Sequence, residues 1–264
     1  MSKWITFASV AILLSAAVPA ASRANDQQRF RTEYTIAAFG LPIGKAGFET
    51  SITDAGAYSV DGTLRSSGIA RIIAAINGSL TAKGLFGGDK ASPSEFAVTY
   101  TEGKKTKTSR FTFSGNTITG AQNEPPVRKR GKWVPLDASQ LVDAADPISA
   151  GMLYAARPRD VCNRTIKAFD GAMRMDIKLS YLRTVPFSAR GFKGDIVTCR
   201  GRFVPIAGYD ADKQDIKWMQ QNGDFEIGFA PIAETSFHAP VSAKVKTRLV
   251  TVRARATRFE QLTN

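Results

Sequence analysis

The feature that most constrains the fold is an alternation of apolar and polar residues that recurs along much of the chain. It is clearest after Asp170-Gly171, where every second residue is apolar: Met173, Met175, Ile177, Leu179 and Tyr181. A period of two residues is typical of a strand with one buried and one exposed face. Because an Asp-Gly pair favours the two-residue turn that suits strand twist, we expect a β-hairpin over residues 165–181.

Other stretches show the same alternation, and turn residues such as Asp54-Ala-Gly56 lie between them. They predict strands at residues 30–36, 46–52, 58–60, 96–100, 110–113, 195–205, 214–218, 224–230 and 242–259. The chain is therefore expected to be mainly β. Its length suits one large β domain, and no internal repeat argues for a division.

A short helix is expected near residue 70. Four residues have the spacing of one helical face: Ile69, Ile72, Ile73 and Ile76. Ser66 or Ser67 is suited to cap the start of this helix, and Gly78 is suited to end it.

A second, central helix is expected from Asp146 to Arg157. Pro147 suits the first helical position after Asp146 as the cap, and Pro158 would end the helix. Met152 and Leu153 share one face of such a helix, so we expect both to be buried. A curved antiparallel sheet, as an open or spiral β-barrel, would wrap around this helix and reduce its own exposed edges.

The first 24 residues have the parts of a secretory signal peptide. Met1-Ser2-Lys3 supplies a positive start, residues 4–18 are almost wholly apolar, and Ser22-Arg23-Ala24 has the small residues of a cleavage site. We expect cleavage near Ala24 and a single periplasmic β domain over residues 25–264. Neither this run nor any later one is long enough for a comfortable membrane span, so no transmembrane segment is expected in the mature chain.

The two cysteines of the chain, Cys162 and Cys199, are expected to form a disulfide. An exported protein with an even number of cysteines is typically disulfide-bonded. The alternative is a redox or metal-binding pair, but the chain has no Cys-x-x-Cys spacing and its single histidine cannot complete a zinc site. We therefore expect no metal and no cofactor.

His238 is the only histidine and the one candidate for a general base near neutral pH. A Ser-His-Asp site forms from residues that meet only in space, so a hydrolase stays open as an alternative. No Gly-x-Ser-x-Gly motif, pair of catalytic carboxylates or phosphate-binding loop accompanies the histidine. A structural or exposed histidine is the favoured interpretation, and no enzymatic activity is expected.

The chain is strongly basic, with a net charge of +13, of which the expected signal peptide carries only Lys3 and Arg23. Two clusters are candidates for weak anion binding: Lys244, Lys246 and Arg248 on one strand face, and Arg128, Lys129 and Arg130 in a loop. Outside the cytoplasm the anions would be lipid head groups, lipopolysaccharide or wall polymer rather than nucleic acid. The alternative is a solvated strand face with lysines that protect a sheet edge.

Four segments, in this order, resemble a family of Gram-negative periplasmic proteins known as domain of unknown function 3108: residues 34–49, 134–156, 162–181 and 199–209. They read YTIAAFGLPIGKAGFE, VPLDASQLVDAADPISAGMLYAA, CNRTIKAFDGAMRMDIKLSY and CRGRFVPIAGY. The resemblance implies a soluble periplasmic protein and carries over no catalytic residue, because the family has no established activity. The layout is also similar to an envelope family whose open, spiralling sheet surrounds a helix and whose members help maintain envelope integrity.

Three functions follow from these expectations. The first is a non-enzymatic envelope protein that binds an anionic envelope component or a partner protein. The second is a carrier that holds a lipid or a lipoprotein acyl chain within the curved sheet, and the third is a hydrolase that uses His238. An apolar cavity that the helix leaves empty would favour the carrier. A filled interior with an external basic face would favour the binder, and an acid and a serine beside His238 would favour the hydrolase.

Overall fold

The structure is a computed structural model that describes residues 27–68, 70–73, 75–232 and 235–262. The expected signal peptide therefore lies outside the described residues. The prediction of a mainly β chain is confirmed, because one antiparallel sheet of 14 strands contains most of the described residues. Among these residues, no helix has both the length and the apolar character needed to cross a membrane.

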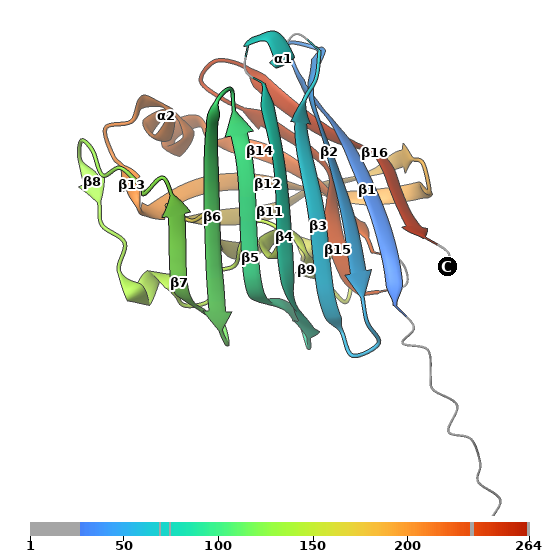
Figure 1. The fold of residues 1–264 in the computed structure, drawn as a ribbon. Coiled ribbons are helices and arrows are strands. Elements are labelled where there is room, and N and C mark those ends of the chain that lie inside the picture. Colours follow the sequence, from blue (N-terminus) through green and yellow to red (C-terminus); the bar gives the residue numbers. More distant parts are fainter. Residues whose placement is uncertain (1–26, 69, 74, 233–234, 263–264) are drawn as a thin grey trace, which may run out of the picture.

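The strands form two meanders that meet at the middle of the sheet (Figure 1). The first meander consists of β1 (Gln28–Ala38), β2 (Leu41–Ile52), β3 (Ala57–Ser66), β4 (Ile76–Gly87), β5 (Lys90–Glu102), β6 (Lys105–Ser114) and β7 (Thr117–Glu124). The second consists of β10 (Arg164–Phe169), β11 (Arg174–Ala189), β12 (Phe192–Ala207), β14 (Asp224–Pro231), β15 (Phe237–Lys246) and β16 (Thr251–Leu262). β16 pairs with β1, so the first and last strands lie side by side.

The sheet folds over on itself, so that β1–β7 form one layer and most of the second meander forms another behind it (Figure 1). The core lies between these layers. Phe111 of β6 and Phe169 of β10 meet there, with ring centroids 5.4 Å apart. β10 is one edge of the sheet and β6 is next to the other edge, so the two edges come close together.

Residues 142–146, here called the seam segment, bridge the two edge strands. Val142 lies opposite Thr117 of β7, and Ala145 lies opposite Ala168 of β10. Backbone hydrogen bonds of 2.7 to 2.9 Å accompany both bridges. Unpaired backbone groups at a sheet edge invite association with other chains, so the seam segment protects both edges.

The predicted central helix from Asp146 to Arg157 is wrong. Only one short 3-10 turn forms there, η2 (Ser149–Gly151), and the chain then extends as β9 (Leu153–Tyr154), which pairs with β15. A helix of about a dozen residues is marginal without tertiary support, and here the edge of β15 supplies backbone partners to an extended chain instead. The expected burial of Met152 and Leu153 is confirmed.

The capping role expected of Asp146 does survive. Its Oδ1 accepts the backbone N–H groups of Ile148 and Ser149, each at 2.9 Å. Two further 3-10 turns flank this region, η1 (Ala138–Leu141) and η3 (Pro158–Val161), and a separate two-stranded sheet pairs β8 (Trp133–Val134) with β13 (Tyr209–Asp210). The whole stretch between β7 and β10 is therefore irregular, with capped turns and short bridges in place of a helix.

The short helix near residue 70 exists but is smaller than predicted. α1 covers only Ala70–Ile73, and both Ile76 and Gly78 belong to β4. Ile69 lies outside the described residues. The strand that follows therefore begins where the isoleucine spacing predicted helix, because isoleucine also favours strands.

Two further predictions near the C-terminus are corrected. Residues 214–218 lie in α2 (Gln214–Asn222) rather than in a strand. The strand predicted over residues 242–259 is two strands, since a turn at Thr247 separates β15 from β16. The Thr247 N–H donates to the carbonyl of Val250 at 2.9 Å, and the Thr247 Oγ1 accepts the N–H of Val250 at 3.1 Å.

The hairpin expected over residues 165–181 is confirmed as β10 and β11, with a longer turn than predicted. Phe169 lies opposite Arg174, so four residues connect the strands. Asp170 stabilises the turn, because its Oδ1 accepts the backbone N–H groups of Ala172 and Met173 at 2.9 and 2.8 Å.

Candidate functional site

The interior of the curled sheet contains an apolar pocket of about 290 Å³. Its walls come from β1, β2, β15, β16 and the η2 turn. The larger side chains that line it are Phe30, Tyr34, Ile36, Phe48, Ile148, Met152, Ile232 and Phe259. Alanines at positions 46, 243 and 254 line it as well, and their small side chains leave the space open.

The burial of the lining residues changes along the pocket. Phe30, Met152 and Phe259 are buried, whereas Ile36 and Ala254 are partly exposed. Ile36 lies opposite Ala254, two positions before the end of β1. The exposed residue of the lining is Pro147, which comes just before the η2 turn.

Tyr34 supplies a polar group to the pocket wall, and this group already has a partner. Its hydroxyl donates to the carbonyl oxygen of Pro240, and burial raises the pKa of this phenol, so it stays protonated. Its ring packs edge-on against Phe48, with centroids 5.8 Å apart. With this hydroxyl satisfied, the pocket favours apolar groups over polar ones.

Asp146 holds the η2 wall of the pocket in place from a buried position. Its carboxylate accepts the backbone N–H groups of Ile148 and Ser149. The hydroxyl of Ser149 in turn lies 2.7 Å from the hydroxyl of Tyr58 on β3. Burial raises the pKa of the Asp146 carboxyl, and the hydrogen bonds only partly offset this effect. The η2 turn is thereby fixed to the first meander by polar contacts beneath the apolar surface.

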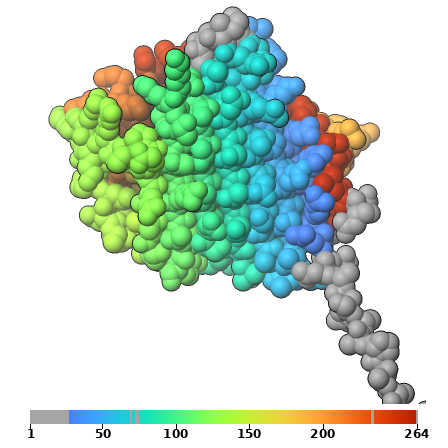
Figure 2. Space-filling model, viewed as in Figure 1, coloured from blue at the N-terminus to red at the C-terminus, as the bar shows by residue number. Residues whose placement is uncertain are grey.

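A larger hollow of about 940 Å³ lies on the outer face of β1–β6, the side that Figure 2 presents to the viewer. Its lining is polar and carries charges of both signs. Arg31 hydrogen-bonds to Glu49 through its Nε at 3.1 Å, and Arg29 lies 3.6 Å from the same carboxylate. Because these charges compensate one another, the hollow offers less for a ligand than the apolar pocket does.

His238 lies on β15, opposite Leu153 of β9, and only 4% of its surface is exposed. Its Nδ1 is 3.2 Å from the carbonyl oxygen of Ser236. Burial lowers the pKa of the imidazole, and Arg164 adds to this effect. In the part of the chain that the structure describes, no carboxylate or hydroxyl side chain hydrogen-bonds to this ring, so no catalytic partner is brought to it.

Acidification should destabilise the protein through His238. Its folded-state pKa lies below the ordinary value of 6.5, so the folded chain binds fewer protons than the unfolded chain. The contribution of His238 to the free energy of unfolding is then fully present above pH 6.5. It falls as pH drops below that value, by at most about 1.4 kcal/mol per pH unit. Urea unfolding of the wild type and His238→Phe at pH 7 and pH 5.5 measures this slope. Because the chain has one histidine, an equal slope in both proteins would contradict the assignment.

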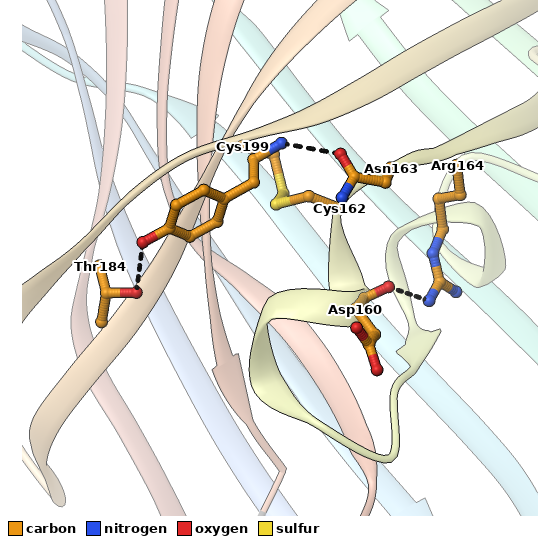
Figure 3. The surroundings of a disulfide bond; sticks show 7 residues. Asp160, Cys162, Asn163, Arg164, Thr184 and Cys199 are labelled. Atoms are coloured by element: carbon orange, nitrogen blue, oxygen red, sulfur yellow. Dashed lines mark hydrogen bonds between the residues drawn. A yellow bond between two sulfur atoms is a disulfide. The ribbon is translucent and has the colours of Figure 1, made fainter.

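Cys162 and Cys199 are joined by a disulfide, as the sequence led us to expect, with Cα atoms 5.6 Å apart (Figure 3). Cys162 lies just before β10, and Cys199 lies in β12. Around the bond, the side-chain oxygen of Asn163 accepts the backbone N–H of Tyr181 at 3.2 Å. Val161 and Phe229 pack beside it in a small buried cluster, so the bond is enclosed in the core.

The strand cations predicted to bind anions are partly neutralised. The Nζ of Lys244 is 3.5 Å from Glu226, and the Nε of Arg248 is 2.8 Å from Asp215 of α2. Arg248 also lies in the turn after β15 rather than on the strand face. Within the described residues, Lys246 has no ion pair, and the same holds for the exposed loop residues Arg128, Lys129 and Arg130.

Sequence reasoning did not identify the pocket, although part of its signal was present. The alternation in residues 30–36 places Phe30, Tyr34 and Ile36 on one face, but it does not say what that face meets. The partners come from β15 and β16, about 200 positions later in the chain. Among the described residues, no group of three or more His, Cys, Asp or Glu side chains is arranged to hold a metal ion.

Comparison with known proteins gives a family and a fold. A family model described as protein of unknown function (DUF3108) matches residues 29–254. The chain is also similar to the crystal structure of a β-barrel-like protein of domain of unknown function DUF1849 from Brucella abortus, with a TM-score of 0.52 and 9% sequence identity. That match covers 90% of this chain and 98% of the other, so it indicates a common fold. No curated protein matches the chain.

Proposed function

The chain belongs to the DUF3108 family of proteins of unknown function, and we propose that it is a non-enzymatic cell-envelope protein that holds an apolar chain inside its curled sheet. The ligand would be the acyl chain of a lipid or lipoprotein. The observation that carries this proposal is the open apolar pocket, which occupies the interior where a central helix was expected. Ligand pockets are typically concave and mostly apolar, with volumes from about 300 Å³ upward.

The chemistry of the walls supports an acyl chain over a polar ligand. Phe30, Phe48 and Met152 offer aromatic and aliphatic contacts, while the Tyr34 hydroxyl is already bonded to the backbone. Removing apolar surface from water stabilises binding by about 25 cal/mol per Å². An unbranched chain also suits a pocket that is open to solvent, because its polar head can remain in water.

An envelope location is supported by the sequence and by the disulfide. The first 24 residues have the pattern of a signal peptide, and disulfides persist in oxidising compartments such as the periplasm. Acyl chains that must cross this aqueous space need a protein that shields them from water. A carrier of this kind needs neither a metal nor a catalytic group.

Binding of an anionic envelope component through the predicted strand face is the second candidate. It has less support, because Lys244 and Arg248 already face carboxylates, which leaves Lys246 as the free cation of that set within the described residues. The hydrolase has the least support, since His238 is buried against backbone groups.

Filling the pocket should weaken the binding of a fatty acid. Ala46 lies on the pocket wall, so Ala46→Phe places a ring where the chain would lie. Fluorescence titration with a pyrene-labelled palmitate should show saturable binding to the wild type and an at least tenfold weaker Kd for the variant. Tenfold corresponds to about 1.4 kcal/mol. Ala97→Phe is the matched control, because Ala97 lines the outer hollow instead, and its Kd should equal that of the wild type.

Thermal unfolding of each variant establishes that it is folded. If Ala46→Phe does not fold, Ala254→Leu, which lines the same pocket from β16, takes its place. A wild type that binds no labelled palmitate, or a folded pocket variant that binds it as well as the wild type, would overturn the proposal.

A further inference from the structure

Two neighbouring turns at one end of the sheet expose large apolar side chains. Phe39 and Leu41 at the β1–β2 turn are 79% and 57% exposed, and Leu249 at the β15–β16 turn is 73% exposed. Strand register places these turns side by side, because Ala38 lies opposite both Leu41 and Val252. α1 lies at the same end (Figure 1). Exposed apolar side chains that gather in one place mark an interaction surface rather than ordinary surface variation.

A cationic pocket of about 630 Å³ lies beside these turns, between β2, β3 and α1. Lys45 and Arg65 lie directly opposite one another on paired strands, and Arg71 lines the same pocket. Like charges directly opposite one another are destabilising. Lys45 and Arg65 also line the outer hollow, which contains Asp61 and Glu49, but neither cation forms an ion pair among the described residues. The Oγ of Ser67, also in the lining, is buried with no hydrogen-bond partner in the described part of the chain. An anion in this pocket would offset the charges.

Phosphate is the anion that this arrangement suits. Lysine and arginine side chains donate charge-assisted hydrogen bonds to phosphate oxygens, and a serine hydroxyl can donate another. Lys246 and Arg253 add positive charge at the same end, and neither has an ion pair within the described ranges. Asp215 is already paired with Arg248, and Glu102, which lies opposite Ile76 of the pocket lining, is paired with Lys107, so neither carboxylate is free to offset these cations.

The lining of the apolar pocket extends towards this end. Its partly exposed lining residues, Ile36, Ala46 and Ala254, lie close to the two turns in strand register. One end of the molecule therefore combines exposed apolar tips, cations that form no ion pair within the described residues, and part of the lining of the interior pocket. A membrane surface with anionic head groups presents the complementary order, with negative charge outside and apolar chains beneath.

We propose that this end docks onto a bilayer that contains anionic phospholipid. Phe39, Leu41 and Leu249 enter the interface, and the pocket formed by Lys45, Arg65 and Arg71 takes a lipid phosphate. The docked orientation brings this end of the apolar pocket close to the acyl chains. The docking surface is argued independently of the proposed acyl-chain ligand. Only the biological purpose of docking rests on that proposed function.

Co-sedimentation with vesicles tests the docking without using the pocket. Vesicles of phosphatidylcholine alone should bind little protein, and vesicles with one-third phosphatidylglycerol should bind it strongly. Two double variants, Phe39→Ser with Leu249→Ser and Lys45→Gln with Arg65→Gln, should each reduce the partition coefficient at least tenfold. Leu85→Ser is the apolar control, since Leu85 is exposed at the other end of β4. Lys178→Gln with Lys193→Gln removes the same charge from exposed positions on β11 and β12.

If either of the two double variants binds vesicles as well as the wild type, the docking surface is wrong. An equal loss of binding in the control variants would also overturn it. Inorganic phosphate could also compete for the cationic pocket. If phosphate at the same concentration as the vesicle phospholipid released all of the bound protein, the bilayer would not be the source of the anion. Ala46→Phe should still sediment with the vesicles, and the two double variants should still bind labelled palmitate in solution. A failure of the pocket proposal is therefore distinguishable from a failure of the docking proposal.

Discussion

Replacing Phe111 with alanine should lower the free energy of unfolding by about 3–5 kcal/mol, the range for large aromatic side chains in cores. Phe111 is 2% exposed and stacks on Phe96 of the neighbouring strand, with ring centroids 4.7 Å apart. It also contacts Phe169 of β10 across the core, where the two edges of the sheet approach one another. Its removal should therefore weaken the closure of the sheet as well as create a cavity. Equilibrium unfolding in urea measures the effect.

Phe39→Ala is the matched control for this prediction. It makes the same chemical change at a side chain that is 79% exposed, so it should alter stability by no more than about 0.5 kcal/mol. A loss below about 1 kcal/mol for Phe111→Ala would show that the core between the edges is not packed as described.

The strands could be predicted from sequence because their signal is local. In β11, Ile177 lies on one face and Asp176 and Lys178 on the other, and this alternation alone identifies a half-buried strand. The Asp170-Gly171 turn likewise depends on residues that are adjacent in the chain. What the local pattern cannot supply is the folding of one part of the sheet over the other.

The prediction of a central helix was wrong because the residues that decide its conformation are distant in the chain. Asp146 and Pro147 are good helix-start residues, and Asp146 does cap a turn. What ends that turn is β15, whose residues Phe237 and His238 pair with an extended β9. Such a partner lies about 85 positions later in the chain, so no local pattern identifies it. The same limit applies to α2, where Ile216 and Trp218 alternate like a strand yet lie in a helix.

The functional residues divide in the same way. The sequence identified the cations Lys244 and Arg248, but not the carboxylates of Glu226 and Asp215 that lie beside them. The apolar pocket depends on β1 meeting β16, the first and last strands of the chain. A cation or a small residue can be read from sequence, whereas the surface to which it belongs is decided by long-range pairing.

The disulfide gives the second large effect. Replacing both Cys162 and Cys199 with alanine should lower the free energy of unfolding by about 4 kcal/mol, because the bond closes a loop of 37 residues and restricts the unfolded chain. The bond joins the start of β10 to β12 inside a buried cluster with Val161 and Phe229. Its loss frees the β10–β11 hairpin at its open end. Urea unfolding of the oxidised wild type and the double variant measures the difference.

A reducing agent separates the contribution of the bond from that of the substitutions. The wild type should lose most of this stability in dithiothreitol and approach the double variant, whose own stability should be unchanged by the reagent. If the two proteins differ as much in dithiothreitol as without it, the loss comes from the missing sulfur atoms in the core and not from the cross-link. Two free thiols in denatured protein prepared from the periplasm under non-reducing conditions would refute the disulfide itself.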